Sequence, residues 1–387
     1  MLAKKSLCVG CSSCSATCPH QCIIMEKDSE GFLYPNIDFK QCISCGLCEK
    51  SCPILIDKTE HLYSTKFYAA QNRNNDVRRI SSSGGIFYAL ALAIINQGGV
   101  VCAAKYSDEF EVIHSIATTE EQLDDFCGAK YAQSEIGQCF VKIKRILIDG
   151  YKVIFIGTPC QVEGLRAYLK CSYENLYLVD MVCHGVPSPF IWKKYLRERE
   201  QYDANGGRIV KVNLRDKSTG WSKYNYSVKF DYINGKKYLM NQNDDMFMKG
   251  FMSNVFLRPS CSSCKFRGIK RNSDITIGDY WGIWKQYPSF DDNKGTSLVI
   301  IHSEKGDGLW NNIIDQLKVL EVSKEEAIQY NPSVIENSIS SQKRAIFFKG
   351  IYRGKSVSEM VKLCVLNQNS KKNSVASRML DYLFNRN

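Results

Sequence analysis

Cys8-x2-Cys11-x2-Cys14-x3-Cys18-Pro19 and Cys42-x2-Cys45-x2-Cys48-x3-Cys52-Pro53 are two copies of one cysteine run near the amino terminus. Each run supplies the four thiolates of a [4Fe–4S] cluster, and its steps of three residues let a short loop wrap a cubane. The proline after each fourth cysteine fixes the following turn. A disulfide framework or zinc knuckles are the alternatives, but duplicated runs of this form favour two clusters. The pattern predicts a module that carries electrons.

The fourth cysteine of each run is expected to serve the other run's cluster. Residues 1–56 therefore form an internal repeat, which we interpret as a ferredoxin-like domain with two [4Fe–4S] clusters. The expected ligands are Cys8, Cys11, Cys14 and Cys52 for the first cluster, and Cys42, Cys45, Cys48 and Cys18 for the second.

Composition indicates a globular protein that works in a reducing compartment. The chain has 387 residues, 44% hydrophobic and 24% charged, and its start shows no stretch typical of a signal peptide. Its longest apolar run, Ile86 to Ile95, is half a membrane span. Without an export signal, 18 cysteines argue for metal ligation instead of disulfides. We expect a cytoplasmic location.

The net charge of +11 is concentrated near the carboxyl end. From Gln342 onward there are ten Lys or Arg against two acids. Such a tail suits an acidic ferredoxin, an anionic membrane surface or nucleic acid, or it is a solvated extension. No nucleic-acid-binding motif is present, so no nucleic-acid partner is expected. Apolar residues at 346–348 and 379–384 suggest that part of this tail packs or makes peripheral membrane contact.

From residue 57 to about 200, helix and strand signals alternate. Helices are expected at 86–97, 120–126, 136–149, 162–170 and 187–202, and strands near 67–69 and at 100–105, 152–156 and 176–182. Short, nearly all-apolar strands between helices indicate an α/β layer with a mainly parallel sheet.

Beyond residue 207 the pattern changes to period two. Segments 224–232 and 236–239 flank Asn234-Gly235, which predicts a hairpin insertion. A helix at 246–254, strands at 274–278 and 297–302, and a helix at 308–317 follow. We predict an α/β catalytic domain over residues 57–340 and a basic helical tail over 341–387.

The loop Ser81-Ser82-Ser83-Gly84-Gly85 directly precedes an apolar helix. A helix start offers free N–H groups, and glycines let an anion approach closely, which suits the pyrophosphate of a flavin dinucleotide. A serine cap with a flexible entry loop is the alternative, and no Rossmann fingerprint is present. Lys130 could neutralise a phosphate or lie near a flavin ring, or it is a surface lysine.

Two further cysteines follow strands whose carboxyl ends should share one edge of the sheet: Cys160, after Gly157-Thr158-Pro159, and Cys183, before His184. Cys261-x2-Cys264 is a half-site that needs two partners. The four thiolates suit a third [4Fe–4S] cluster or a structural zinc, or they are core thiols. The remaining six cysteines are interpreted as core residues.

The motifs SSSGG, GAKYAQS, GTPCQVEGL, CHGVPSP, CSSCKFRG and DITIGDYWG follow the cysteine-rich module in this order. Together they resemble the coenzyme F420 hydrogenase/dehydrogenase beta-subunit family over residues 1–305. The resemblance implies an iron–sulfur flavoprotein with FAD, whose relatives exchange hydride with F420 or reduce chlorophyll precursors with ferredoxin. It also implies a cofactor cleft, and the expected cofactor-binding residues are Ser82, Ser83, Gly84, Gly85, Lys130, Tyr131, Ser134, Gly157, Thr158, Pro159, Asp274 and Gly278.

The mechanism expected from these features is electron transfer from a ferredoxin-type donor through the clusters to FAD, and on to a small-molecule substrate as hydride. His184, Tyr131 and Asp279 are the candidate proton donors. Two alternatives remain: an electron-transfer subunit of a hydrogenase or dehydrogenase complex that uses F420, and a cluster-bearing sensor or scaffold without turnover.

Overall fold

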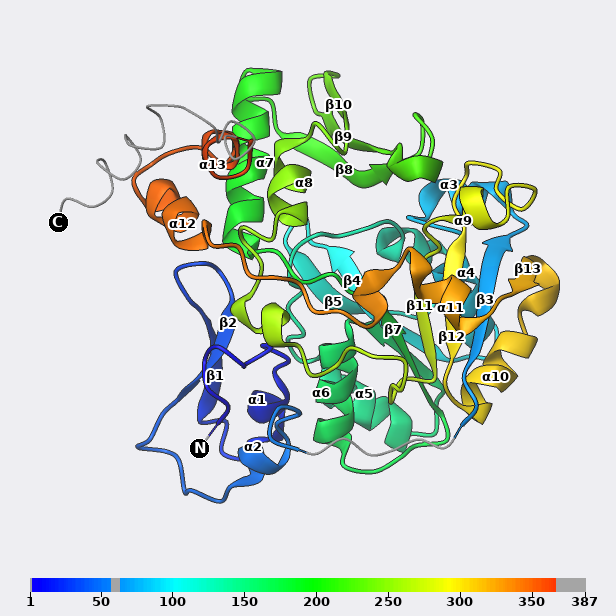
Figure 1. The fold of residues 1–387 in the computed structure, drawn as a ribbon. Helices are drawn as coiled ribbons and strands as arrows, with labels where there is room; N and C mark the ends of the chain where they lie inside the picture. Colours follow the sequence, from blue (N-terminus) through cyan, green and yellow to red (C-terminus); the bar gives the residue numbers. More distant parts are fainter. Residues whose placement is uncertain (1, 57–62, 367–387) are drawn as a thin grey trace.

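The computed structural model describes residues 2–56 and 63–366 (Figure 1). The first cysteine run continues into helix α1 (Ser13–Thr17), and the second into helix α2 (Leu47–Lys50). Between the runs the chain forms an antiparallel hairpin of β1 (Ile23–Lys27) and β2 (Leu33–Ile37). The predicted repeat is therefore two short helical segments joined by a hairpin that the sequence analysis did not predict.

The centre of the molecule is an eight-stranded sheet in the order β13-β3-β12-β11-β7-β6-β4-β5. The four central strands β11, β7, β6 and β4 are parallel, while the pairings toward both edges are antiparallel. The predicted α/β class is confirmed, with the parallel pairing confined to the centre. The strands are β3 (Lys66–Asn72), β4 (Val100–Tyr106), β5 (Val112–Ala117), β6 (Val153–Gly157), β7 (Leu176–Met181), β11 (Ile275–Asp279), β12 (Ser297–Ile301) and β13 (Leu317–Glu321).

Helices cover both faces of this sheet. In β6, Ile154 and Ile156 pack into the core under α4 (Ile86–Ile95) and α10 (Glu304–Asn311). The alternate residues Val153 and Phe155 pack into the core under α5 (Cys139–Ile148) and α6 (Pro159–Leu169). Because successive side chains of a strand point to opposite faces, a strand buried on both faces must be almost wholly apolar. Helix α3 (Asn75–Ile80) precedes the serine–glycine loop.

A second core lies under the three-stranded sheet β10-β9-β8, which contains the predicted hairpin. Strands β8 (Ile209–Asp216), β9 (Ser227–Tyr232) and β10 (Lys237–Asn241) are antiparallel. They pack on α7 (Pro189–Ala204) and α8 (Met246–Met252), together with α12 (Arg344–Tyr352) and α13 (Val357–Cys364) (Figure 1). Phe347 and Phe348 are buried there, so the first part of the basic segment packs against the protein.

Several expectations differ from the structure in detail. Helix α6 begins at Pro159 instead of Val162, and 121–126 is a 3-10 helix. Edge strands β5 and β13 were not predicted. Smaller helices α9 (Ile283–Gln286) and α11 (Lys324–Gln329) complete the fold. Within the described residues, no helix combines the length and apolar character needed to cross a membrane. The apolar stretch 379–384 lies outside the described residues.

Candidate functional site

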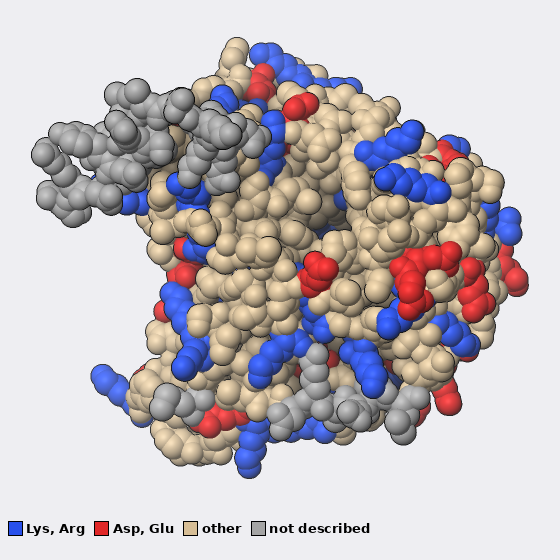
Figure 2. All heavy atoms as spheres, in the orientation of Figure 1, with Lys and Arg blue, Asp and Glu red and all other residues tan. Residues whose placement is uncertain are grey.

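Strands β3, β4, β6, β7 and β11 all run in one direction, so their carboxyl ends meet at one edge of the sheet. The segments that follow this edge carry the serine–glycine loop, Cys160 and Cys183, and Asp279 is the last residue of β11. Open α/β sheets bind ligands at the carboxyl ends of their strands. Figure 2 shows the molecule hollowed on one face between the part that carries the three-stranded sheet and the part that carries the central sheet.

Cys160, Cys183, Cys261 and Cys264 line one cavity, with an empty volume of about 460 Å³ that is partly open to solvent. Cys160 lies in the first turn of α6, and Cys183 follows β7. The Sγ of Cys261 accepts a hydrogen bond from the backbone N–H of Val186 at 3.5 Å. Three segments far apart in sequence thus bring four cysteines to one cavity.

Burial and the closeness of these four thiols raise the pKa values of Cys160 and Cys183. Burial, together with the neighbouring Cys261 and Cys264, raises the pKa of the Cys183 thiol to about 12, while Arg267 opposes the rise. Burial also raises the pKa of Cys160 well above its usual value, with the other three cysteines adding to the effect. Thiols placed this way give up their protons when a metal centre supplies the compensating positive charge.

Within the described residues, no three His, Cys, Asp or Glu side chains converge closely enough to hold a single metal ion. A cubane separates its ligand sulfurs more widely than one ion does, and the four cysteines around an open cavity suit that wider arrangement.

In the amino-terminal module the four cysteines expected to hold the first cluster lie near one another. Burial raises the pKa of the Cys14 thiol, and the thiols of Cys8, Cys11 and Cys52 add to the rise because they lie close to it. The second run lies nearer the surface, where Cys45 is exposed.

Cys22 adds a thiol that the sequence analysis assigned to the core. Its Sγ lies 3.3 Å from that of Cys18, and it also hydrogen-bonds to Cys42. It is buried, as expected, but beside the second ligand set.

The first ligand set and the four-cysteine cavity touch each other. Cys160 and Cys264 pack against the buried cluster of Val9, Cys11, Ile54 and Phe266, and so does Cys52. Helix α6 approaches the Cys11 loop so closely that a Cβ on Gly164 would lie 2.7 Å from the Cβ of Cys11. The two groups of cysteines are therefore immediate neighbours.

The serine–glycine loop is held by the protein on one side. The N–H of Gly84 donates to Ser297 Oγ at 2.9 Å, and a Cβ on Gly84 would lie 2.3 Å from the carbonyl oxygen of Ala70. Gly84 is thus required by close packing. Gly85 caps α4 with a φ of 83°, a conformation that glycine adopts without strain.

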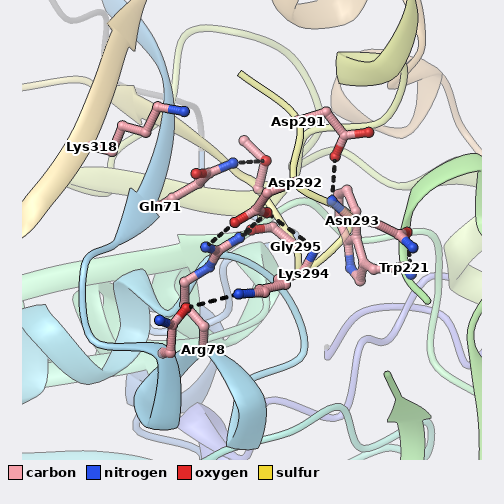
Figure 3. Close-up of polar contacts among 12 residues, drawn as sticks. Gln71, Arg78, Trp221, Asp291, Asp292, Asn293, Lys294, Gly295 and Lys318 are labelled. Atoms are coloured by element: carbon pink, nitrogen blue, oxygen red, sulfur yellow. Dashed lines mark hydrogen bonds and ion pairs between the residues drawn. The ribbon is translucent and has the colours of Figure 1, made fainter. Parts of the chain in front are cut away.

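The segment 291–295 lies against Arg78, which precedes this loop (Figure 3). The Arg78 guanidinium donates to both carboxylate oxygens of Asp292, at 2.6 and 2.5 Å, and to the carbonyl of Gly295 at 2.8 Å. Trp221 Nε1 donates to the carbonyl of Ser82 at 3.1 Å. These contacts fix the loop before the first turn of α4.

Two partly buried lysines lie near the loop without a carboxylate in ion-pair contact among the described residues. Lys217 Nζ donates to the carbonyls of Arg78, Ser83 and Lys294 at 2.6, 2.6 and 2.8 Å, and burial lowers its pKa to about 7. Lys130 Nζ donates to three carbonyls of residues 126–128, and burial lowers its pKa to about 8. Two such lysines beside a helix start suit an anionic group such as a pyrophosphate, whose charge would favour their protonated forms.

Tyr131 and Asp279 are brought together by an arginine. The guanidinium of Arg215 lies 2.6 Å from the Asp279 carboxylate, and donates to Tyr131 Oη at 3.0 Å. It also stacks over the rings of Tyr226 and Trp281, with its central carbon 4.1 and 4.9 Å from their centroids. Burial raises the pKa of Tyr131, so its hydroxyl stays protonated at neutral pH.

His184 lies beside this group, separated from Tyr131 by Phe251, whose ring centroid is 5.2 Å from the His184 ring and 4.8 Å from that of Tyr131. Asn254 donates its amide N–H to the carbonyl of Ile339, so its Oδ1 accepts from His184 Nε2 at 2.6 Å. Burial lowers the pKa of His184, and the ring is neutral.

The other expected cofactor residues lie at different places. Ser134 Oγ accepts from Gln161 Nε2 at 2.8 Å, next to Thr158. Gly157 ends β6, Pro159 begins α6, and Gly278 packs against Val182 near the same edge. Asp274 lies at the amino end of β11, one strand length or about 16 Å from Asp279, where it accepts from Leu178 N–H and Ser303 Oγ. The structure does not bring Asp274 to the edge with the others.

Three regions of the chain match models of known protein families. Residues 67–139 match the amino-terminal family model of the coenzyme F420 hydrogenase/dehydrogenase beta subunit, and residues 150–327 match the carboxyl-terminal model of the same family. The two matches together span more than half of the chain. Residues 7–56 match the 4Fe-4S dicluster domain.

Among curated proteins, the coenzyme F420-dependent sulfite reductase of Methanocaldococcus jannaschii is 22% identical over 81% of this chain. The chain spans only 47% of that relative's length. Pyruvate synthase subunit PorD of Methanothermobacter marburgensis is 36% identical over 14% of this chain and 59% of its own length.

Among solved structures, a chain of the xenon-derivatised F420-reducing [NiFe] hydrogenase complex from Methanosarcina barkeri is similar, with a TM-score of 0.45 and 16% identity. The match covers 72% of this chain and 93% of that one.

Proposed function

This chain belongs to the coenzyme F420 hydrogenase/dehydrogenase beta-subunit family, and from that membership we propose that it is an iron–sulfur flavoprotein oxidoreductase. In the proposed reaction, electrons from a ferredoxin-type donor reach an organic small-molecule substrate as hydride. Cubane clusters would supply one-electron carriers, and FAD would convert single electrons to a pair. Because cluster ligands must be reduced thiolates, the proposal places the protein in the cytoplasm.

One observation carries the proposal: Cys160 and Cys264 of the carboxyl-side cavity pack against Cys11 and Cys52 of the amino-terminal module. An amino-terminal module in contact with the four-cysteine cavity would give electrons a continuous path into the catalytic domain. We infer that the cavity holds a third [4Fe–4S] cluster.

The flavin would bind beyond this site, at the serine–glycine loop. Gly85 and the start of α4, with Lys130 and Lys217, would hold its phosphates. Arg215 orients Tyr131 and the Asp279 carboxylate toward one another, which keeps a proton donor and an acceptor in fixed positions. His184, with its proton on Nε2, is directed to Asn254.

A second candidate is an electron-transfer subunit that uses coenzyme F420 in a larger complex. It is favoured by the length of the M. jannaschii relative, which is more than twice the length that this chain matches. A stable hetero-complex on purification, or reduction by F420 in the absence of ferredoxin, would select this candidate.

The test is the cofactor content of anaerobically purified protein. Three cubanes predict about twelve iron and twelve sulfide, with one FAD. The Cys160→Ser variant should lose about four iron and slow flavin bleaching by ferredoxin in stopped-flow measurements. Cys171→Ser, which changes an exposed cysteine outside all three sets, should keep full iron. About eight iron in the unmodified protein would reject the third cluster, and no flavin after reconstitution would reject the reductase.

A further inference from the structure

Arg258 is a buried arginine at the junction between the amino-terminal module and the four-cysteine cavity. Its side chain is 2% exposed, and it lines the cavity together with Val9 and Cys261. A buried charge is costly unless an opposite charge or a full set of hydrogen bonds compensates for it. The partners of Arg258 therefore decide what it does.

All the hydrogen-bond acceptors of Arg258 are neutral. Nε donates to the carbonyl of Cys8 at 2.8 Å, one terminal nitrogen donates to Gln133 Oε1 at 2.7 Å, and the other donates to the carbonyl of Leu33 at 2.9 Å. The guanidinium also stacks over Tyr34, with its carbon 4.3 Å from the ring centroid. In the described part of the chain, no carboxylate lies within ion-pair distance of it.

The other two arginines of the cavity differ in this respect. Arg271 is equally buried, but it pairs with the buried Asp180 at 3.0 Å, so that its charge is already balanced. Arg267 lacks a carboxylate partner among the described residues, yet it is partly exposed and donates to the carbonyls of Ser333 and His184. Of these three arginines, Arg258 is the one that is deeply buried and has no carboxylate partner among the described residues.

The groups that face Arg258 on both sides are cysteine ligands. It holds the carbonyl of Cys8 in the first run, and a Cβ on Gly10, the residue before Cys11, would lie 2.7 Å from one of its terminal nitrogens. On the cavity side it lines the four-cysteine cavity beside Cys261, whose backbone N–H donates to the Arg258 carbonyl at 3.0 Å. Among the described residues, its side-chain hydrogen bonds and ring contacts reach Cys8, Phe32, Leu33, Tyr34 and Gln133, and none of them goes to a cysteine of the second set.

We propose that Arg258 is the shared counter-ion of the first cluster and of the cluster in the four-cysteine cavity, and that it raises the reduction potential of both. A cubane with four thiolates is anionic, and reduction adds one electron and one further negative charge without making or breaking a bond. A cation held out of water between two such sites stabilises the reduced form of each, because solvent screens it little. The effect on the cluster in the four-cysteine cavity rests on the proposed function, whereas the effect on the first cluster does not.

The experiment compares Arg258→Met with Lys265→Met in the holoprotein. Lys265 carries the same charge near the same ligands, donating to the carbonyl of Ile54 at 2.9 Å, but it is exposed and therefore screened. Potentials are measured by redox titration followed by EPR. Signals are assigned with Cys45→Ser and Cys160→Ser, which disturb the second and the third site.

Arg258→Met should lower the equilibrium constant for reduction at least about tenfold, about 59 mV for a one-electron couple, at the first and third sites. The second site and Lys265→Met should change far less. Equal shifts at all sites, or no shift at the first site, would overturn the proposal. If unmodified protein holds only about eight iron, the third cluster is rejected, and the first-site potential still decides the role of Arg258.

If Arg258→Met loses its iron, Arg258→Lys decides. Full iron and nearly unchanged potentials in that variant would show that the charge is what matters. Equal loss of iron would show that Arg258 acts through its shape and hydrogen bonds, and the proposal would be wrong.

Discussion

Replacing Gly164 by alanine tests whether helix α6 and the first cysteine run are packed as tightly as the structure shows. The added Cβ would lie 2.7 Å from the Cβ and 3.0 Å from the Sγ of Cys11. Real Cβ atoms do not come this close to other atoms, so either α6 or the ligand loop must move. Overpacking of this kind costs about 1–3 kcal/mol of unfolding free energy. Because Cys11 is an expected cluster ligand, the movement should also disturb the first cluster.

Helix propensity acts in the opposite direction and must be separated from the clash. Alanine favours a helix interior over glycine by about 1 kcal/mol. Gly308 in α10 offers the matched control, since a Cβ there meets no atom within 4 Å. Gly308→Ala should therefore be stabilised by about 1 kcal/mol. The difference between the two variants isolates the overpacking and should be about 1–3 kcal/mol.

The assay is anaerobic denaturant unfolding of both variants, combined with iron content and the EPR spectrum of the reduced clusters. We expect Gly164→Ala to unfold at a lower denaturant concentration than Gly308→Ala and to show an altered signal from the first cluster. If both variants gain the same stability and the EPR spectrum is unchanged, the contact between α6 and the Cys11 loop is not as close as described.

Two further predictions concern stability. Burial lowers the pKa of His114 to about 4, below its unfolded value of about 6.5. About 3 kcal/mol of unfolding free energy is therefore present above pH 6.5 and lost as the pH falls toward 4. His114→Gln should flatten the pH dependence of unfolding in this window, and an unchanged profile would contradict the assignment. The bidentate ion pair of Arg344 with Glu30 joins α12 to the hairpin of the amino-terminal module, so a double-mutant cycle of Arg344→Met and Glu30→Gln should give a coupling of about 1–3 kcal/mol. Proteolysis of the hairpin should become faster in either single variant, and a coupling near zero would show that the pair does not hold the module.

The residues that could be predicted from the sequence carry their chemistry in short local patterns. The two cysteine runs need only three-residue spacing, and the positions of Cys160 and Cys183 follow from the apolar strands that precede them. Partners for Cys261 and Cys264 could be inferred because a pair of thiols is half a site. In each case the signal lies within a few residues of the candidate side chain.

The residues that could not be predicted depend on distant contacts. Arg215 and Lys217 stand in an ordinary polar stretch of β8 and its following loop, and only the fold places them against Asp279 and Ser83. Gly84 looked like a phosphate contact, yet its closest neighbours are backbone atoms of β3 and β12. Strand β13 is short and mixed in polarity, and its pairing with β3 is what determines it.

The position of the cysteines also bears on the order in which electrons would travel in the proposed function. Cys45 of the second set is exposed, whereas Cys11 of the first set is buried against α6 and packs near Cys160. In the proposed function, an external donor would therefore reach the second set first. Arg258 holds the Cys8 and Leu33 carbonyls and Arg344 holds Glu30, and these contacts link the module to the rest of the protein in this orientation. Electron transfer from the module to the catalytic domain would then depend on the contacts of these two arginines. A variant that removes the contacts of Arg258 or Arg344 should slow this transfer step without changing the exposed second set.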